Sequence, residues 1–284
     1  MQQHAWFTET LHSQIEMHLK MDHILVQEKT QFQDLTIFEN STVGKVLALD
    51  GAIQTTEADE FIYHEMITHV PILAHGDAQE VLIIGGGDGG VLHRCILHPQ
   101  IKRVTMIEID STVIERCKQY LPMISNNAFS NPKTELIIAD AATYLATTDR
   151  YFDVIIVDST DPKGPSIPLF GPQFYSDCKK RLGSSGILIT QCGTPFLQPN
   201  IIKTSYQHLC LLFRDTWFYT ASVPTYIGGL LAIGWATDDT LLRHFSTETI
   251  QYRLQNTNII TNYYTPELHV AAFALPRYFH PLMK

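Results

Sequence analysis

The sequence lacks any apolar run that approaches the roughly 18 residues of a membrane span. Its first residues, MQQHAWFTETLHSQ, also lack the order of a secretory signal peptide, in which charged residues precede an apolar stretch. We therefore expect a cytoplasmic protein with no membrane partner.

Cysteine and basic charge are both scarce. The 284 residues include five cysteines, an odd number without a C-x-x-C pair, so we expect reduced thiols. Lys and Arg number 20 against 29 Asp and Glu, a net charge of −9, which argues against a nucleic-acid partner because such proteins need a basic face. None of the 13 histidines has the i, i+4 spacing with a third ligand that a metal site needs, and we expect no metal.

The remaining composition, 45% hydrophobic and 17% charged, is typical of a globular protein. Residues 23–55 alternate apolar and polar residues between turn sequences such as Asp50-Gly51, which predicts a small antiparallel sheet. Residues 55–73 predict a bridging helix that begins after a Thr-Thr-Glu cap signal and stops at Pro71.

From residue 80 onward, apolar strands alternate with amphipathic helices. This order is typical of a parallel sheet covered by helices on both faces, a doubly wound α/β fold. The strands are expected at 81–85, 103–110, 134–140, 153–158 and 186–192, with helices at 90–98, 111–121, 141–147 and 171–182. We divide the chain into an N-terminal β domain with its bridging helix, residues 1–75, and a catalytic α/β domain, residues 76–284.

The segment LIIGGGDGGVL, residues 82–92, has the G-x-G-x-x-G spacing of a dinucleotide-binding loop at Gly85, Gly87 and Gly90. Asp88 lies inside that loop, and at about 4 Å it would repel a pyrophosphate by roughly 1 to 4 kcal/mol. The loop therefore favours a nucleoside that carries positive charge over NAD.

Acids end four successive strands, where open parallel sheets bind ligands. They are Asp88, Glu108 with Asp110, Asp140, and Asp158 with Asp161. Any one of them could be a helix N-cap or a turn residue, but four in succession indicate a site. Glu108 follows Gly90 at about the 20-residue distance typical of a ribose-binding acid, and Asp140 could accept a hydrogen bond from an adenine amine. Together they predict adenosine without phosphates, as in S-adenosylmethionine-type ligands.

The segment DVIIVDSTDPKGP, residues 153–165, places two aspartates in a loop braced by prolines. A primary amine with a pKa near 10.4 costs roughly 4 kcal/mol to deprotonate at neutral pH. A carboxylate that accepts the proton during attack lowers that barrier. An amine substrate is therefore expected beside Asp158 and Asp161.

At these residues the chain resembles the spermidine synthases, the polyamine aminopropyltransferases, and most closely the bacterial enzymes. The similarity extends over nearly the whole chain: WFTETLH, LDGAIQTTEADEFIYHEM, VLIIGGGDGGVL, EID, YFDVIIVDSTDPKGP, VPTY and YYTPELHVAAFALP. It implies a Rossmann-like, methyltransferase-type sheet and transfer of an aminopropyl group from decarboxylated S-adenosylmethionine to putrescine, which yields spermidine and methylthioadenosine. It implies no permanently bound cofactor, and a homodimer or homotetramer.

The resemblance also assigns roles to residues. Asp158 would accept the proton and Tyr63 would help to place the attacking nitrogen. The glycine turn, with Gly85, Gly87 and Asp88, would bind the co-substrate, and its adenosine part would contact Gln33, Glu108, Asp140, Ala141 and Pro165. The amine channel would be lined by His64, Asp88, Asp158, Ser159, Thr160, Asp161 and Tyr226.

The chain departs from the family pattern at Ala58, Ala141, His93-Arg94 and Ile167-Pro168. These departures concern the adenine rim and the loop beside it, so they bear on affinity and on the range of diamines. Two alternatives stay open. An amine N-methyltransferase would use intact S-adenosylmethionine, whose carboxylate Asp88 would repel, and a polyamine or nucleoside sensor would bind without turnover.

Overall fold

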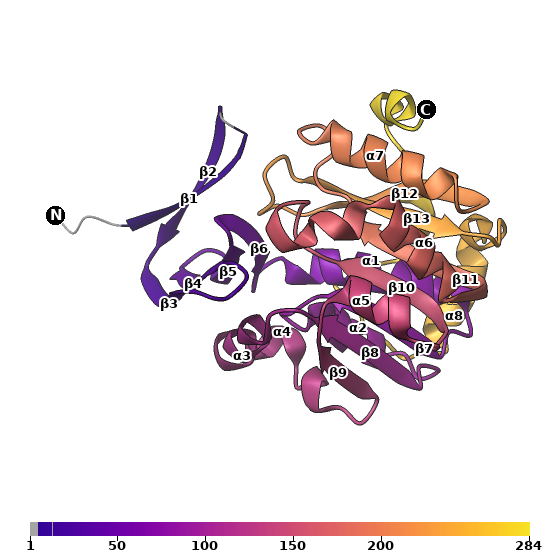
Figure 1. Ribbon diagram of the computed structural model, residues 1–284, viewed down its shortest axis with the longest axis horizontal. Coiled ribbons are helices and arrows are strands. Elements are labelled where there is room, and N and C mark those ends of the chain that lie inside the picture. Colours follow the sequence, from indigo (N-terminus) through magenta and orange to yellow (C-terminus); the bar gives the residue numbers. More distant parts are fainter. Residues whose placement is uncertain (1–4, 13) are drawn as a thin grey trace.

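The computed structural model describes residues 5–12 and 14–284. Its N-terminal part is made of antiparallel strands, which lie to the left in Figure 1. A hairpin of β1 (Ala5–His12) and β2 (Ile15–Met21) precedes a four-stranded sheet of β3 (His23–Lys29), β4 (Asp34–Asn40), β5 (Gly44–Leu49) and β6 (Ala52–Thr56). The predicted sheet over 23–55 is confirmed, and the hairpin before it forms a separate two-stranded sheet.

The bridging helix α1 (Glu60–His75) does not stop at Pro71, so that prediction is wrong. An interior proline costs a helix about 3 kcal/mol. The turn that follows contains Ile72 and Leu73, which are 0% and 1% exposed, and burying each of them contributes roughly 1.5 to 3 kcal/mol. Burial of the last turn therefore outweighs the cost of the proline.

The larger domain is built on a seven-stranded sheet with the order β12-β13-β11-β10-β7-β8-β9. The five predicted strands are parallel to one another: β7 (Glu80–Gly85), β8 (Arg103–Glu108), β9 (Thr134–Ile138), β10 (Phe152–Asp158) and β11 (Leu182–Gln191). Two further strands, β12 (Asp215–Ser222) and β13 (Leu230–Thr237), add an antiparallel edge that the sequence analysis did not predict.

Helices cover both faces of this sheet, as predicted for a doubly wound fold. One buried cluster joins the sheet to α1, α2 (Gly90–Ile96) and α8 (Thr247–Gln255). A second cluster, on the other face, joins it to α5 (Ala141–Thr147), α6 (Pro172–Lys180) and α7 (Pro199–Cys210). The other helices are α3 (Ser111–Tyr120), α4 (Pro122–Ser125) and α9 (Pro266–Ala271), with short 3-10 turns at η1 (Ala128–Ser130), η2 (Gly164–Phe170), η3 (Leu242–His244) and η4 (Arg277–Leu282).

The strand order reverses between β7 and β10, and this arrangement positions the site. From β7 the chain proceeds to β8 and β9 on one side and then crosses to β10 and β11 on the other. Asp158 at the end of β10 pairs in register with Gly85 at the end of β7. Crevices at such switch points are where open α/β sheets bind ligands.

The N-terminal sheet closes one side of this crevice. Buried Leu35 and Leu47 of β4 and β5 pack against Val113 and Cys117 of α3, so the strand ends carrying Glu108 and the N-terminal strands belong to one packed unit. In the described residues, no helix combines the length and the apolar character needed to cross a membrane.

Candidate active site

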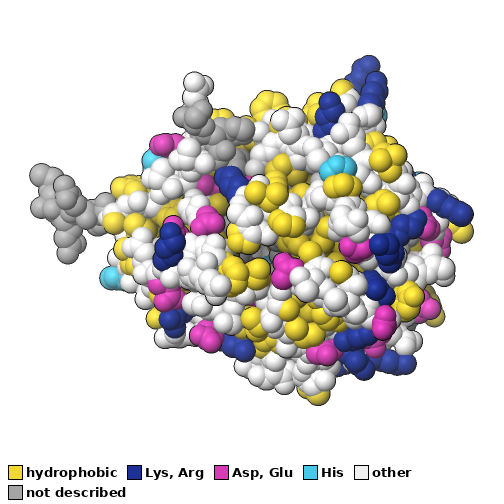
Figure 2. All heavy atoms as spheres, in the orientation of Figure 1, with side chains coloured by type: hydrophobic (Ala, Val, Ile, Leu, Met, Phe, Trp, Pro, Cys, Tyr) yellow, Lys and Arg dark blue, Asp and Glu magenta, His cyan; other side chains and the backbone are white. Residues whose placement is uncertain are grey.

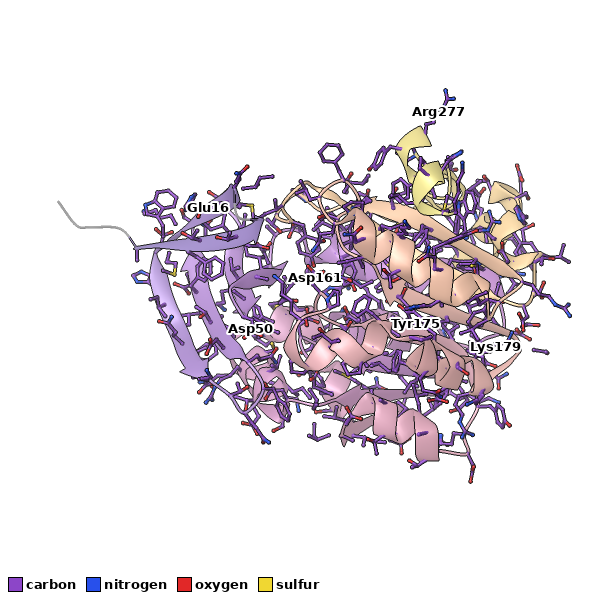
Figure 3. The ribbon with its side chains drawn as sticks, turned by 45° about the horizontal axis from the view of Figure 1, so that its top comes forward. Glu16, Asp50, Asp161, Tyr175, Lys179 and Arg277 are labelled. Carbon is purple, nitrogen blue, oxygen red and sulfur yellow. The ribbon has the colours of Figure 1, made fainter. Side chains whose placement is uncertain are left out.

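One pocket lies at the carboxyl ends of the parallel strands, between the central sheet and the N-terminal strands. Figure 3 labels two of its lining residues, Asp50 beside the N-terminal strands and Asp161 beside the larger domain. In Figure 2, hydrophobic side chains surround a hollow near the middle of the face shown, and Lys and Arg lie mostly toward its edges. The residues predicted from sequence that line the pocket are Gln33, Tyr63, Gly85, Gly87, Asp88, Glu108, Asp140, Ala141, Asp158, Ser159, Thr160, Asp161, Pro165 and Tyr226. His64 does not line it.

The glycine turn lies directly against the end of β10. Gly85 and Gly86 have φ values of 83° and 72°, a backbone conformation that residues with a Cβ atom rarely adopt. A Cβ on Gly85 would come within 2.2 Å of the Asp158 carbonyl oxygen, and one on Gly86 within 2.9 Å of Asp158 Oδ2. The Gly86 amide donates to that carbonyl at 2.9 Å. The glycines therefore allow the turn to pack against Asp158.

Asp158 is the central acid of the pocket. The hydroxyl of Tyr63 donates to Asp158 Oδ1 at 2.6 Å. Burial and the nearby Asp88 carboxylate raise the pKa of Asp158 to about 6, although the charge of His64 and the Tyr63 hydrogen bond lower it. A carboxylate with this pKa is ionised at neutral pH and is a stronger base than an ordinary aspartate.

Two tyrosines form the wall beside Asp158. The Tyr63 and Tyr226 ring centroids lie 6.4 Å apart, and the Tyr226 hydroxyl donates to the Gln54 carbonyl at 2.6 Å. Burial, followed by the charge of Asp158, raises the pKa of both phenols well above the usual value. Both hydroxyls therefore remain protonated donors.

Asp88 both stabilises the glycine turn and faces the pocket. Its Oδ1 accepts a hydrogen bond from the Gly90 amide at 2.8 Å, at the start of α2. Its Oδ2 lies 3.3 Å from His64 Nε2. The same carboxylate lines the pocket, so the acid in the glycine turn faces the space a ligand would occupy.

The wall on the β8 side carries the residues predicted to contact adenosine. Burial raises the pKa of Glu108 to about 7, and Glu108 Oε1 accepts from the Asp110 amide at 3.0 Å. Gln33 Nε2 donates to Asp110 Oδ2 at 3.0 Å, which fixes the N-terminal sheet to this wall. Asp140 accepts a hydrogen bond from the Thr143 amide at 2.7 Å and so caps the N-terminus of α5. The N-cap role that the sequence allowed for this acid is therefore present in the structure.

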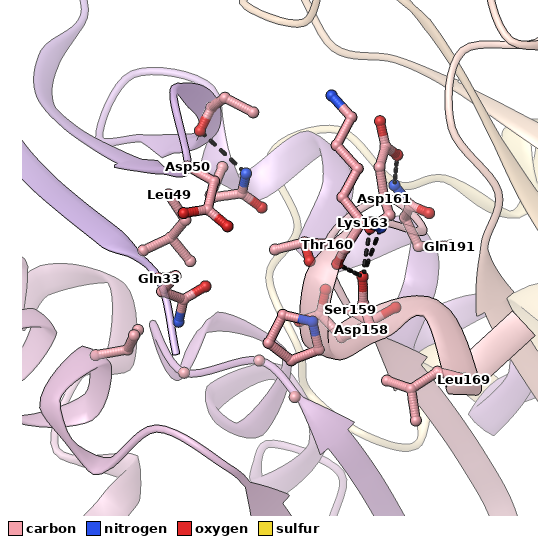
Figure 4. A pocket seen from close by; sticks show the side chains of 18 of the residues that line it. Gln33, Leu49, Asp50, Asp158, Ser159, Thr160, Asp161, Lys163, Leu169 and Gln191 are labelled. Carbon is pink, nitrogen blue, oxygen red and sulfur yellow. Dashed lines mark hydrogen bonds between the residues drawn. The ribbon is translucent and has the colours of Figure 1, made fainter. Parts of the chain in front are cut away.

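The opposite end of the pocket contains polar groups that sequence reasoning missed. Asp161 accepts from Gln191 Nε2 at 3.0 Å and from Gln198 Nε2 at 2.5 Å, as seen for Gln191 in Figure 4. Glu9, on β1, also lines this end, and burial raises its pKa to about 7. The position of Gln191 at the end of β11 could have identified it, but an isolated Glu9 in a strand gave no signal.

The Ser159 hydroxyl is buried at the wall of the pocket. It has no hydrogen-bond partner among the described residues, and Ser159 lines the pocket between Asp158 and Thr160. A buried hydroxyl without a partner is rare in folded proteins, and a functional role is one explanation for such a group.

The arrangement combines apolar walls with several carboxylates at separate points. Ile107, Val113, Ala141 and Leu169 line the pocket together with the acids. Such a site can enclose a flat apolar group, orient cations and accept a proton. Within residues 5–12 and 14–284, no three His, Cys, Asp or Glu side chains are arranged to hold a metal ion.

Two families match the chain. Residues 60–245 match the family described as "Spermine/spermidine synthase domain", and residues 5–57 match the "Spermidine synthase tetramerisation domain". The chain is 50% identical over 272 residues to "Polyamine aminopropyltransferase 1" of Pseudomonas aeruginosa, covering 96% of this chain and 95% of that protein. It is 48% identical over 280 residues to "Polyamine aminopropyltransferase" of Salmonella schwarzengrund, covering 99% and 98%.

Two solved structures share the whole fold. A spermidine synthase in complex with the transition-state analogue AdoDATO superposes with a TM-score of 0.94 at 35% identity, over 99% of this chain and 95% of that one. The spermidine synthase from Thermotoga maritima superposes with a TM-score of 0.90 at 33% identity, over 99% and 94%.

Proposed function

This chain belongs to the spermine/spermidine synthase family and is a polyamine aminopropyltransferase. From that premise, we propose that it converts decarboxylated S-adenosylmethionine and putrescine into spermidine and methylthioadenosine. The observation that carries the proposal is the pair of carboxylates, Asp88 and Asp158, in one pocket with the Tyr63 hydroxyl bound to Asp158.

In the proposed reaction the amine attacks the donor directly. The lone pair of the putrescine nitrogen forms a bond to the carbon next to the sulfonium, and the carbon–sulfur bond electrons pass to sulfur, leaving neutral methylthioadenosine. The proton lost by nitrogen goes to Asp158, whose pKa of about 6 suits a base at neutral pH. Tyr63 occupies one carboxylate oxygen and leaves the other for this proton.

The donor would lie along the β8 wall. Glu108 would accept hydrogen bonds from the ribose hydroxyls and Asp140 from the adenine amine, with the glycine turn beneath. Gln33, Ala141 and Pro165 would enclose the adenosine. The structural neighbour with AdoDATO supports a donor that lacks the carboxylate of S-adenosylmethionine, because that carboxylate would lie near Asp88 and Asp158.

The acceptor would extend from Asp158 toward Asp161. Its attacking nitrogen would lie near Asp158 and Tyr63, and its distal ammonium would lie near Asp161 and Glu9. Ser159, Thr160 and Tyr226 would line the passage between the two ends. A diamine with one nitrogen at each end, the distal one an ammonium, matches this separation of the acids, which favours putrescine over a single-amine methyl acceptor.

We also propose that the chain forms a homodimer or homotetramer through its N-terminal strands. The match of residues 5–57 to a tetramerisation domain supports this assembly. The division into residues 1–75 and 76–284 is part of the same proposal, with α1 counted as the end of the first domain.

The test is a product analysis with two donors and a panel of amines. The purified protein is incubated with decarboxylated S-adenosylmethionine or with S-adenosylmethionine, and with putrescine, cadaverine or spermidine, and the products are identified by mass. Spermidine formed only from the decarboxylated donor supports the proposal. Methylated amines would establish the methyltransferase alternative, and binding without product would establish a sensor.

A further inference from the structure

A chain of buried ion pairs lies directly behind the pocket wall. Arg94 Nη2 lies 2.9 Å from Glu60 Oε1, Glu60 Oε2 lies 2.6 Å from His64 Nδ1, and His64 Nε2 lies 3.3 Å from Asp88 Oδ2. The four side chains are between 2% and 14% exposed. They connect α1 and α2 to the glycine turn, and only Asp88 among them lines the pocket.

The His64 ring has no freedom to turn toward a ligand. Both of its nitrogens face carboxylates, and the side chain is 2% exposed. The ring also lies over Gly90, where a Cβ would come within 2.2 Å of Cε1 and Nδ1. The orientation of the imidazole is therefore set by α1, α2 and Asp88.

His64 carries positive charge in this position. Burial alone lowers the pKa of an imidazole, but the charge and hydrogen bond of Asp88, followed by those of Glu60, raise the pKa of His64 to about 10. The other titratable groups that face this cluster are Tyr63 and His69 on α1, His93 on α2, Cys117 on α3, Asp158 at the end of β10, and Tyr226. His64 lies 3.3 Å from Asp88, and its positive charge lowers the pKa of Asp158.

We propose that His64 is a positioning residue: clamped by the Arg94–Glu60 pair, it orients the Asp88 carboxylate from behind and supplies a positive charge that offsets the repulsion of Asp158 by Asp88. The assignment replaces a direct contact between His64 and the amine. It rests on the proposed function, because Asp158 is the base of that reaction.

The reason lies in the repulsion between the two pocket carboxylates. Asp88 raises the pKa of Asp158, and the charge of His64 lowers it. Without His64, the Asp88 carboxylate would favour the protonated form of Asp158 more strongly. A protonated Asp158 cannot accept the proton of the amine, so a change behind the pocket wall would alter the pH range in which the enzyme works.

The test compares His64→Gln with His75→Gln by pH profile. Gln keeps a hydrogen-bond donor but has no charge, and His75 lies at the end of the same helix with its own carboxylate partner, Asp77, at 2.9 Å. In His64→Gln, we expect the acidic limb of kcat/KM to move up by about one pH unit, with kcat recovering at high pH. His75→Gln should keep the wild-type limb.

A uniform loss of kcat at every pH, with the limb unmoved, would overturn the proposal, because that result describes a merely structural histidine. A second measurement uses the wild-type protein and needs no turnover. Imidazole ¹⁵N NMR should show His64 with both nitrogens protonated from pH 6 to pH 9. A neutral ring in that range overturns the proposal even if the enzyme is active, whereas a charged ring in a protein without transferase activity would contradict only the proposed function.

Discussion

Replacing Asp158 with Asn tests the assignment of the catalytic base. The substitution removes the proton acceptor and keeps the size of the side chain and an oxygen for the Tyr63 hydroxyl, which donates to Asp158 at 2.6 Å. Loss of a positioned general base lowers kcat by roughly 100-fold or more, equivalent to about 2.7 kcal/mol in the activation barrier.

The same substitution should not lower the stability of the fold, although it lowers kcat. The pKa of Asp158 rises from 3.8 to about 6 on folding, so the folded protein binds this proton more tightly than the unfolded chain. Ionisation of the carboxylate therefore destabilises the fold increasingly as the pH rises from about 4 to about 6. Above the folded-state pKa of about 6 this destabilisation has its full value. A shift of about two pKa units corresponds to on the order of 3 kcal/mol, so Asp158→Asn should leave Tm unchanged or raise it at pH 7.5.

The assay measures kcat from the rate of methylthioadenosine release at saturating donor and amine, and Tm by thermal unfolding of the same samples. Asp153→Asn is the matched control at the opposite end of β10. Asp153 accepts hydrogen bonds from the Gln79 and Glu80 amides at 2.7 and 2.9 Å and does not line the pocket. This variant should keep its kcat and lose some stability.

A kcat within a few-fold of wild type in Asp158→Asn would refute the reasoning. A large loss of kcat accompanied by a large fall in Tm would also count against it, because the variant would then be misfolded rather than lacking a base. The expected combination is a slow enzyme that is at least as stable as the wild type.

Three further predictions concern neighbouring residues. Glu108→Gln should weaken methylthioadenosine binding by roughly 1 to 3 kcal/mol, the value of a charge-assisted hydrogen bond; unchanged affinity by calorimetry would exclude the ribose contact. Asp88→Asn should narrow the preference for decarboxylated over intact donor by roughly 1 kcal/mol or more, measured as competitive dissociation constants for both donors at one salt concentration. A constant ratio of the two constants would leave Asp88 its contacts with Gly90 and His64 but no role in donor selection. Tyr63→Phe removes a hydrogen bond that lowers the pKa of Asp158, so the acidic limb of kcat/KM should move up by about half to one pH unit, and an unmoved limb would contradict the role given to the hydroxyl.

Local patterns were sufficient to place the five parallel strands along the chain and to identify the acids of the pocket. Apolar strands with acids at their ends predicted that Asp88, Glu108, Asp140 and Asp158 would meet, and all four line one pocket. The prediction worked because parallel strands bring their carboxyl ends to one edge whatever the details of packing. The resemblance to the spermidine synthases then added Tyr63 and Tyr226, which no spacing rule singled out.

Contacts between distant segments decided the rest. Glu9 reaches the pocket only because the β1–β2 hairpin packs beside β6, with the Ile53 amide donating to Glu9 at 3.2 Å. The helix passes Pro71 because its last turn is buried, and a proline rule cannot weigh that burial. His64 points behind Asp88 rather than into the pocket because Glu60 and Gly90 fix its ring. Sequence periodicity determines which residues reach a strand end or a helix face, but the direction in which each side chain then turns, and the pKa it acquires, depend on neighbours that only the folded chain brings together.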